Sequence, residues 1–121
     1  MANYAEINGS GRNRNVYVSN RTVVTPDKSI THENCPDIEE TIRTSIEQEK
    51  NEVILDCKNI ELLDSTALEL LIKIHYELRS KRGALKIIGL NEVCQDILTA
   101  TRLNNILIIY KDIHEAIRNL S

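Results

Sequence analysis

The sequence predicts an α/β fold in which strands and helices alternate along the chain. Short apolar runs of strand length lie at residues 53–57, 84–88 and 106–110, and each is followed by a segment whose apolar residues have helical spacing. Alternation of this kind favours a mostly parallel sheet with right-handed crossovers. We therefore expect a mixed sheet of four or five strands with about four helices.

The N-terminal part is expected to add an antiparallel edge to this sheet. Residues 15–19 alternate with valines on one face, and residues 22–25 are β-branched throughout. Two such runs close together predict a hairpin. The preceding segment, residues 1–14, is polar and contains glycines, so we expect a flexible arm with a short edge strand at residues 4–7.

Four helices are expected, and each has a recognisable boundary. The first should span about residues 36–49, where isoleucine recurs every four residues, and the second residues 66–80. Gly83 should end the second helix, since glycine is common just past a helix C-terminus. Asn91 and Asp112 should cap the last two helices by accepting a backbone N–H. The strand and helix periods together predict buried side chains at Val53, Leu55, Leu70, Leu71, Ile74, Ile87 and Ile97.

Length and composition indicate one domain, residues 1–121, of a globular cytoplasmic protein. A chain of 121 residues with 41% hydrophobic residues can bury its own core. The absence of Phe and Trp and a net charge of −3 argue against nucleic-acid binding. No apolar run approaches the roughly 18 residues of a membrane span, and no signal peptide is recognisable, so no membrane insertion is expected. Three cysteines without a CxxC pair predict free thiols in a reducing compartment.

The junction between the strand at 53–57 and the helix at 66–80 is the candidate functional site. A helix N-terminus offers unpaired backbone N–H groups and a partial positive charge, so a phosphate can lie there at low cost. The spacing leaves the capping residue open. Thr66 with Glu69 fits the capping box S/T-x-x-E, and Asp64 or Ser65 could equally serve as the cap.

Residues 52–120 carry a resemblance to a known family. An apolar strand ends at Asp56, a loop follows, and Asp64-Ser65-Thr66-Ala67-Leu68 opens a helix. This arrangement resembles the STAS domain, in which the helix opens with Asp-Ser-[Ser/Thr]-Gly-Leu. Ala67 stands in place of the usual glycine, and the usual Gly-x-Leu-Asp motif is absent from residues 28–31. The resemblance implies a single-domain STAS-like fold.

The resemblance also implies a function, that of a bacterial anti-sigma factor antagonist. In such proteins the serine at the position of Ser65 is phosphorylated by a serine kinase that is itself the anti-sigma factor. The unphosphorylated form binds this kinase, the phosphorylated form releases it, and a separate protein phosphatase resets the switch. The expected partner-binding residues are Asp64, Ser65, Thr66, Ala67, Leu68, Glu69 and Ile72.

Other interpretations of the chain are weaker but remain open. The main alternative is a constitutive STAS interaction subunit of a signalling or transport assembly, with Ser65 only a helix cap. Asp56 ends a strand as in receiver domains, but Asp27 alone stands where a receiver needs an acidic pair for Mg²⁺. His32 and Cys35 lack the second pair of a zinc site. We therefore expect no catalytic residue, no metal and no cofactor.

Overall fold

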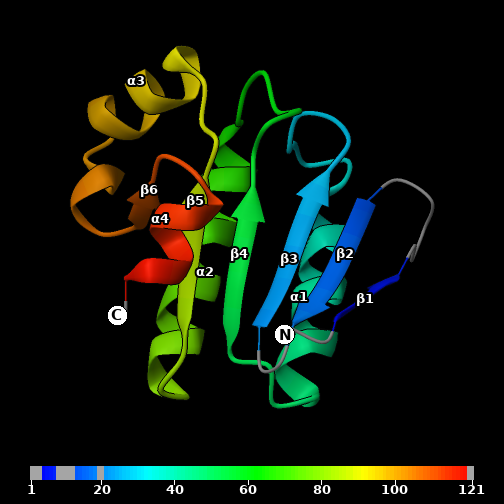
Figure 1. Cartoon of the computed structure of the whole chain (residues 1–121). Helices are drawn as coiled ribbons and strands as arrows, with labels where there is room; N and C mark the ends of the chain where they lie inside the picture. Colours follow the sequence, from blue (N-terminus) through cyan, green and yellow to red (C-terminus); the bar gives the residue numbers. More distant parts are fainter. Residues whose placement is uncertain (1–3, 8–12, 19–20, 120–121) are drawn as a thin grey trace.

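The computed structural model describes residues 4–7, 13–18 and 21–119 (Figure 1). The strands are β1 (Tyr4–Ile7), β2 (Asn13–Val18), β3 (Arg21–Pro26), β4 (Glu52–Asp56), β5 (Ala84–Ile88) and β6 (Ile108–Tyr110). The helices are α1 (Cys35–Glu47), α2 (Ser65–Ser80), α3 (Glu92–Ala100) and α4 (Ile113–Arg118), and a short 3-10 helix, Leu103–Asn105, precedes β6.

The described strands form one six-stranded sheet in the order β1-β2-β3-β4-β5-β6. β1, β2 and β3 pair antiparallel, and β3 to β6 pair parallel. Each parallel connection passes through a helix, which gives the chain the length that such a crossover needs. The predicted α/β class and antiparallel edge are confirmed. The edge strand expected at residues 4–7 is confirmed as β1, and with it the described sheet has six strands rather than the four or five expected.

Helices cover the two faces of the sheet unequally. In Figure 1, α1 and α2 lie side by side behind the sheet, and α4 lies in front of it near β5 and β6. Because side chains of a strand alternate between faces, β4 contributes Val53 and Leu55 to the larger core and Ile54 to a smaller core beneath α4. This layering leaves the N-terminus of α2 at the end of the sheet where the parallel strands finish.

Most of the predicted core is confirmed, with one exception. The side chains of Val53, Leu55, Leu70, Leu71, Ile74 and Ile87 are buried. Ile97 is only half-buried, so its prediction was wrong. Neighbouring Leu98 takes the inward position on α3 instead, since it is fully buried.

The start of the last strand and the left-handed residue after α2 differ from the predictions. The last strand begins at Ile108 rather than Ile106, because the carbonyl of Leu103 accepts the N–H of Leu107 and holds residues 103–107 in a helical turn. Gly83 lies after α2 as expected, but Arg82, with φ 62°, takes the left-handed position. A Cβ on Gly83 would lie 2.0 Å from the carbonyl oxygen of Asn51, so a close backbone approach requires this glycine.

The predicted flexible arm over residues 1–14 falls in large part outside the described residues, and the single-domain assignment stays a prediction. Among the helices that the structure describes, none is long and apolar enough to cross a membrane.

Candidate functional site

Asp64 is the N-cap of α2. Its backbone is extended, with φ −90° and ψ 178°, and its Oδ1 accepts the N–H of Ala67 at 2.9 Å. Ser65 is therefore the first residue of the helix, and its side chain is exposed. Of the three capping residues that the sequence left open, the structure selects Asp64. Ser65 is thereby left without a capping role.

A second contact ties Asp64 to a distant loop. Its Oδ2 accepts the backbone N–H of His32 at 2.8 Å and lies 3.5 Å from His32 Nδ1. The pKa of the Asp64 carboxyl is lowered, first by the N–H of Ala67 and then by the bonds from His32. The cap therefore stays ionised, and its negative charge lies beside Ser65. Sequence reasoning missed His32 in this role, and the pattern around it contains no signal for it.

The loop before α2 is held by the segment before α1. Ser29 Oγ accepts the N–H groups of Glu61 and Leu62, both at 3.1 Å, and Ile30 forms a parallel bridge with Leu63. Because these bonds satisfy the loop's backbone groups, the approach to Ser65 is preorganised rather than loose.

The other predicted partner-binding residues do not share one surface. Thr66 and Glu69 are exposed like Ser65. Ala67 is fully buried, so its side chain cannot contact a partner and its assignment to the binding surface was wrong. Leu68 and Ile72 are partly buried and pack against the larger core. A residue four positions after a surface residue shares its helix face, which explains why Ser65 and Glu69 lie outward while Ala67 and Leu71 lie inward.

The N-terminus of α3 is joined to the same loop. Asn91 caps α3 as predicted, with its Oδ1 accepting the N–H of Cys94 at 2.7 Å. Its Nδ2 donates to the carbonyl oxygens of Ile60 and Glu61 at 3.3 and 3.1 Å. One asparagine thus fixes the start of α3 and its position against the approach to α2, and only the capping half was visible in the sequence.

Asp56 and the cysteines, which the sequence also offered as candidate functional groups, have structural roles or are buried. Asp56 Oδ1 accepts the N–H of Lys58 at 3.1 Å, which is a loop-capping contact. The three cysteines are free, as expected, and all three are buried, which raises the pKa of each thiol. Within the described residues, no cluster of three histidine, cysteine or acidic side chains could hold a metal ion.

Two buried groups near this framework were not anticipated. Lys86, within the apolar run of β5, is fully buried. His75 is 2% exposed, and neither ring nitrogen has a hydrogen-bond partner. Burial and then the nearby Arg79 lower the pKa of His75. Both belong to the packing of the helices rather than to the surface around Ser65.

Comparison with known proteins agrees with this framework. The family model of the STAS domain matches residues 13–116. The chain therefore belongs to the STAS domain family. A search of curated protein sequences found no match.

Solved structures of similar fold include several anti-sigma factor antagonists. A Thermotoga maritima protein described as a candidate anti-sigma factor antagonist is 22% identical, with a TM-score of 0.79 over 98% of this chain and 92% of that one. The antagonist SpoIIAA in its unphosphorylated form is 16% identical, with a TM-score of 0.69 over 95% and 93%. The phosphorylated form of the Bacillus protein SpoIIAA is 16% identical, with a TM-score of 0.63 over 96% and 97%. At these identities the similarity concerns the fold.

Proposed function

We propose that this protein is an anti-sigma factor antagonist whose binding to an anti-sigma factor kinase is switched off by phosphorylation of Ser65. The observation that carries the proposal is the exposed hydroxyl of Ser65 at the first position of α2, in a chain of the STAS family. The fold similarity to an antagonist solved in both phosphorylated and unphosphorylated forms supports it.

The position suits a reversible modification. A kinase must reach the Ser65 oxygen, and the side chain is exposed. A phosphate there would gain from the N–H groups and partial positive charge of the helix N-terminus. It would also be repelled by Asp64 and Glu69, because it carries about −1.5 to −2 charges. These opposing effects leave α2 in place, so the phosphate acts mainly on the partner by adding charge and bulk to the contact.

The proposal assigns distinct roles to the partners. A serine kinase that is also the anti-sigma factor binds the unmodified surface, and a separate phosphatase removes the phosphate from Ser65. Both binding events take place in the cytoplasm, and this chain binds its partners without catalysing a reaction. The rival is a constitutive STAS subunit of a signalling or transport assembly, in which Ser65 remains unmodified.

The first test is the modification itself. Intact-mass analysis of the protein from its own cells, followed by peptide mapping, should find a phosphate on Ser65. Thr66→Ala is the matched control, because Thr66 is the adjacent exposed hydroxyl. This variant should keep the phosphate, whereas Ser65→Ala should lose it.

The second test is binding of the candidate anti-sigma factor kinase by calorimetric titration. Ser65→Ala should bind within about tenfold of wild type, since it removes at most one hydrogen bond of about 0.5–1.5 kcal/mol. Ser65→Asp should bind more weakly, although a single carboxylate imitates a phosphate only in part. Asp64→Ala separates two roles of Asp64. Weaker binding with a lower melting temperature indicates loss of the helix cap, and weaker binding with an unchanged melting temperature indicates loss of recognition by the kinase. Equal affinity of wild type, Ser65→Ala and Ser65→Asp, with no phosphate on Ser65 in cells, would favour the constitutive subunit.

A further inference from the structure

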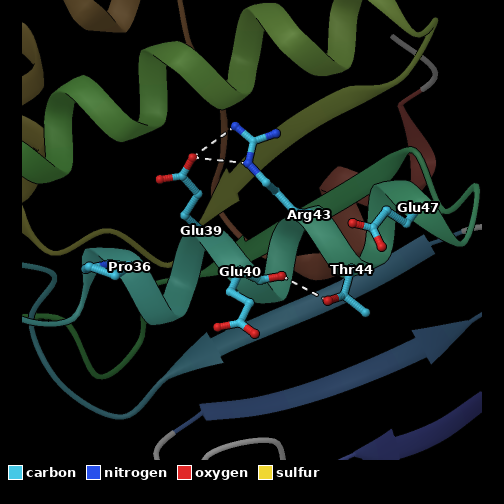
Figure 2. Close-up of a pocket in the computed structure, with 6 residues that line it drawn as sticks. All are labelled: Pro36, Glu39, Glu40, Arg43, Thr44 and Glu47. Carbon is cyan, nitrogen blue, oxygen red and sulfur yellow. Dashed lines mark hydrogen bonds and ion pairs between the residues drawn. The ribbon is translucent and has the colours of Figure 1, made fainter.

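Acidic side chains on the α1–α2 face are neutralised by neighbouring bases. The guanidinium of Arg43 lies 2.9 Å from a carboxylate oxygen of Glu39 and 2.6 Å from one of Glu77. Lys73 Nζ lies 3.0 Å from the same Glu39 oxygen. Figure 2 shows Arg43 and Glu39 meeting on the side of α1 that faces α2. These acids are therefore satisfied within the fold.

The acids that surround the start of α2 and α3 differ in this respect. Glu61, Glu92 and Asp96 are exposed, and within the described part of the chain none of them forms an ion pair. Glu92 gains from the N-terminus of α3, but Asp96 lies one turn further along the same face. Like charges at this spacing disfavour a helix. A basic group supplied from outside would relieve this repulsion.

Two exposed apolar side chains lie on the same two segments. Leu62, in the loop before α2, is 47% exposed, and Val93, on the first turn of α3, is 55% exposed. The segments are joined where Asn91 Nδ2 and Cys94 Sγ lie 3.1 and 3.6 Å from the carbonyl oxygen of Glu61. Figure 1 shows both at the end of the sheet where the parallel strands finish. Apolar contacts within a polar rim are typical of protein interfaces.

We propose that these segments form a docking surface for a partner protein that presents an apolar side chain surrounded by lysines or arginines. The surface, here called the loop–α3 surface, consists of Glu61, Leu62, Glu92, Val93 and Asp96. Charge complementarity selects the occupant, because three unpaired carboxylates disfavour an acidic partner and leave a basic one to complete the ion pairs.

The inference deepens the proposed function, on which it rests for the partner's identity. The loop–α3 surface supplies affinity that does not depend on Ser65, and modification of Ser65 acts separately at the start of α2. Removing negative charge from α3 should therefore weaken partner binding by the same factor whether or not Ser65 is modified.

The experiment uses the isotope-labelled full chain and a defined probe, a synthetic amphipathic peptide with lysine on one face and leucine on the other. A peptide with glutamate in place of every lysine is the control probe. The lysine peptide should shift the amide signals of Leu62, Val93 and Asp96, and the glutamate peptide should not. Affinity should fall with added salt, because exposed ion pairs are screened.

Matched variants separate this surface from general attraction to an acidic protein. Glu92→Lys with Asp96→Lys should weaken the lysine peptide at least tenfold. Glu40→Lys with Glu47→Lys makes the same charge change at exposed positions of α1 (Figure 2) and should alter affinity less than twofold. Val93→Ser keeps every charge, so it should weaken binding without changing the salt dependence of the affinity. This variant also tests the surface if the α3 double variant fails to fold.

Several results would overturn the proposal. These are equal losses in the two double variants, equal binding of the two peptides, or signal shifts confined to Gln95, Ile109 and Tyr110, which line a separate hollow beside β6. The outcomes for Ser65 are independent. A chain that binds the lysine peptide at the loop–α3 surface but carries no phosphate retains this surface and loses the switch. A phosphorylated chain with no such binding loses the surface alone.

Discussion

Replacing Lys86 should destabilise the protein more than any other change to a single lysine. Lys86 Nζ donates to the carbonyl oxygens of Ala116 and Asn119 at 2.7 and 2.5 Å, at the C-terminus of α4, and lies 2.9 Å from Glu52 Oε1. The three N–H donors of the ammonium group thus all have partners. Glu52 also pairs with Arg21.

The magnitude follows from these contacts. Lys86→Met keeps most of the length of the side chain but leaves two carbonyls without their donor and Glu52 with Arg21 as its remaining partner. Removing one partner of a buried pair costs about 3–5 kcal/mol, and the lower end applies because Glu52 keeps Arg21. About 3 kcal/mol is a large part of the roughly 5–15 kcal/mol that stabilises a domain. The melting temperature should fall by about 10 °C.

Urea unfolding followed by circular dichroism measures this loss directly. Lys58→Met is the matched control, because Lys58 is exposed, and it should change the free energy of unfolding by less than about 0.5 kcal/mol. The double variant with Glu52→Gln should show a coupling of about 0.5–3 kcal/mol between the two side chains. If Lys86→Met matched the control, the reasoning that this ammonium group holds α4 on the sheet would be refuted.

Three further predictions concern positions whose surroundings are equally specific. Stability should decrease as the pH falls below about 6.5, because the pKa of His75 is lower in the folded state and the unfolded chain therefore binds the proton first. Urea titrations at several pH values should show that His75→Leu removes this dependence. Parallel pH profiles of stability for wild type and His75→Leu would contradict the prediction. Gly83→Ala should lower the free energy of unfolding by about 1–3 kcal/mol, because its Cβ would collide with the Asn51 carbonyl. Arg82→Gly should raise the free energy of unfolding by about 1 kcal/mol, because glycine tolerates the positive φ. Thermal melting distinguishes the two signs. Asn91→Ala should cost about 1–2 kcal/mol in denaturant unfolding, because it removes both the cap of α3 and the bonds to the loop. A loss below about 0.3 kcal/mol would mean that neither contributes.

Local patterns in the sequence predicted much of the framework correctly. The α/β class followed from periods of two and 3.6, and the caps at Asn91 and Asp112 followed from polar residues just before an apolar stripe. These features depend on residues within four positions of one another, so a single sequence carries the information. The place of Ser65 at the start of a helix rests on the same local information.

Tertiary contacts determined which of the three possible residues caps α2. Thr66 had a capping-box partner in Glu69, yet Asp64 caps the helix and also accepts the N–H of His32, which lies 32 positions away. No local period encodes that contact. The failed assignment of Ala67 to the binding surface has a related cause, since the inward direction of a helix is set by what it packs against.

By itself, then, the sequence determined which segments become strands and helices and that a serine stands at the start of α2. Hydrophobic periods and caps act over a few residues, so a single sequence carries them. Only the tertiary structure decided the surroundings of that serine. Ser29 and Asn91, each about thirty positions from the loop, bind its backbone and place α3 beside it, and a lysine within an apolar strand finds its partners on α4. Such contacts form because buried polar groups must be paired, and their partners are found only once the sheet brings distant segments together.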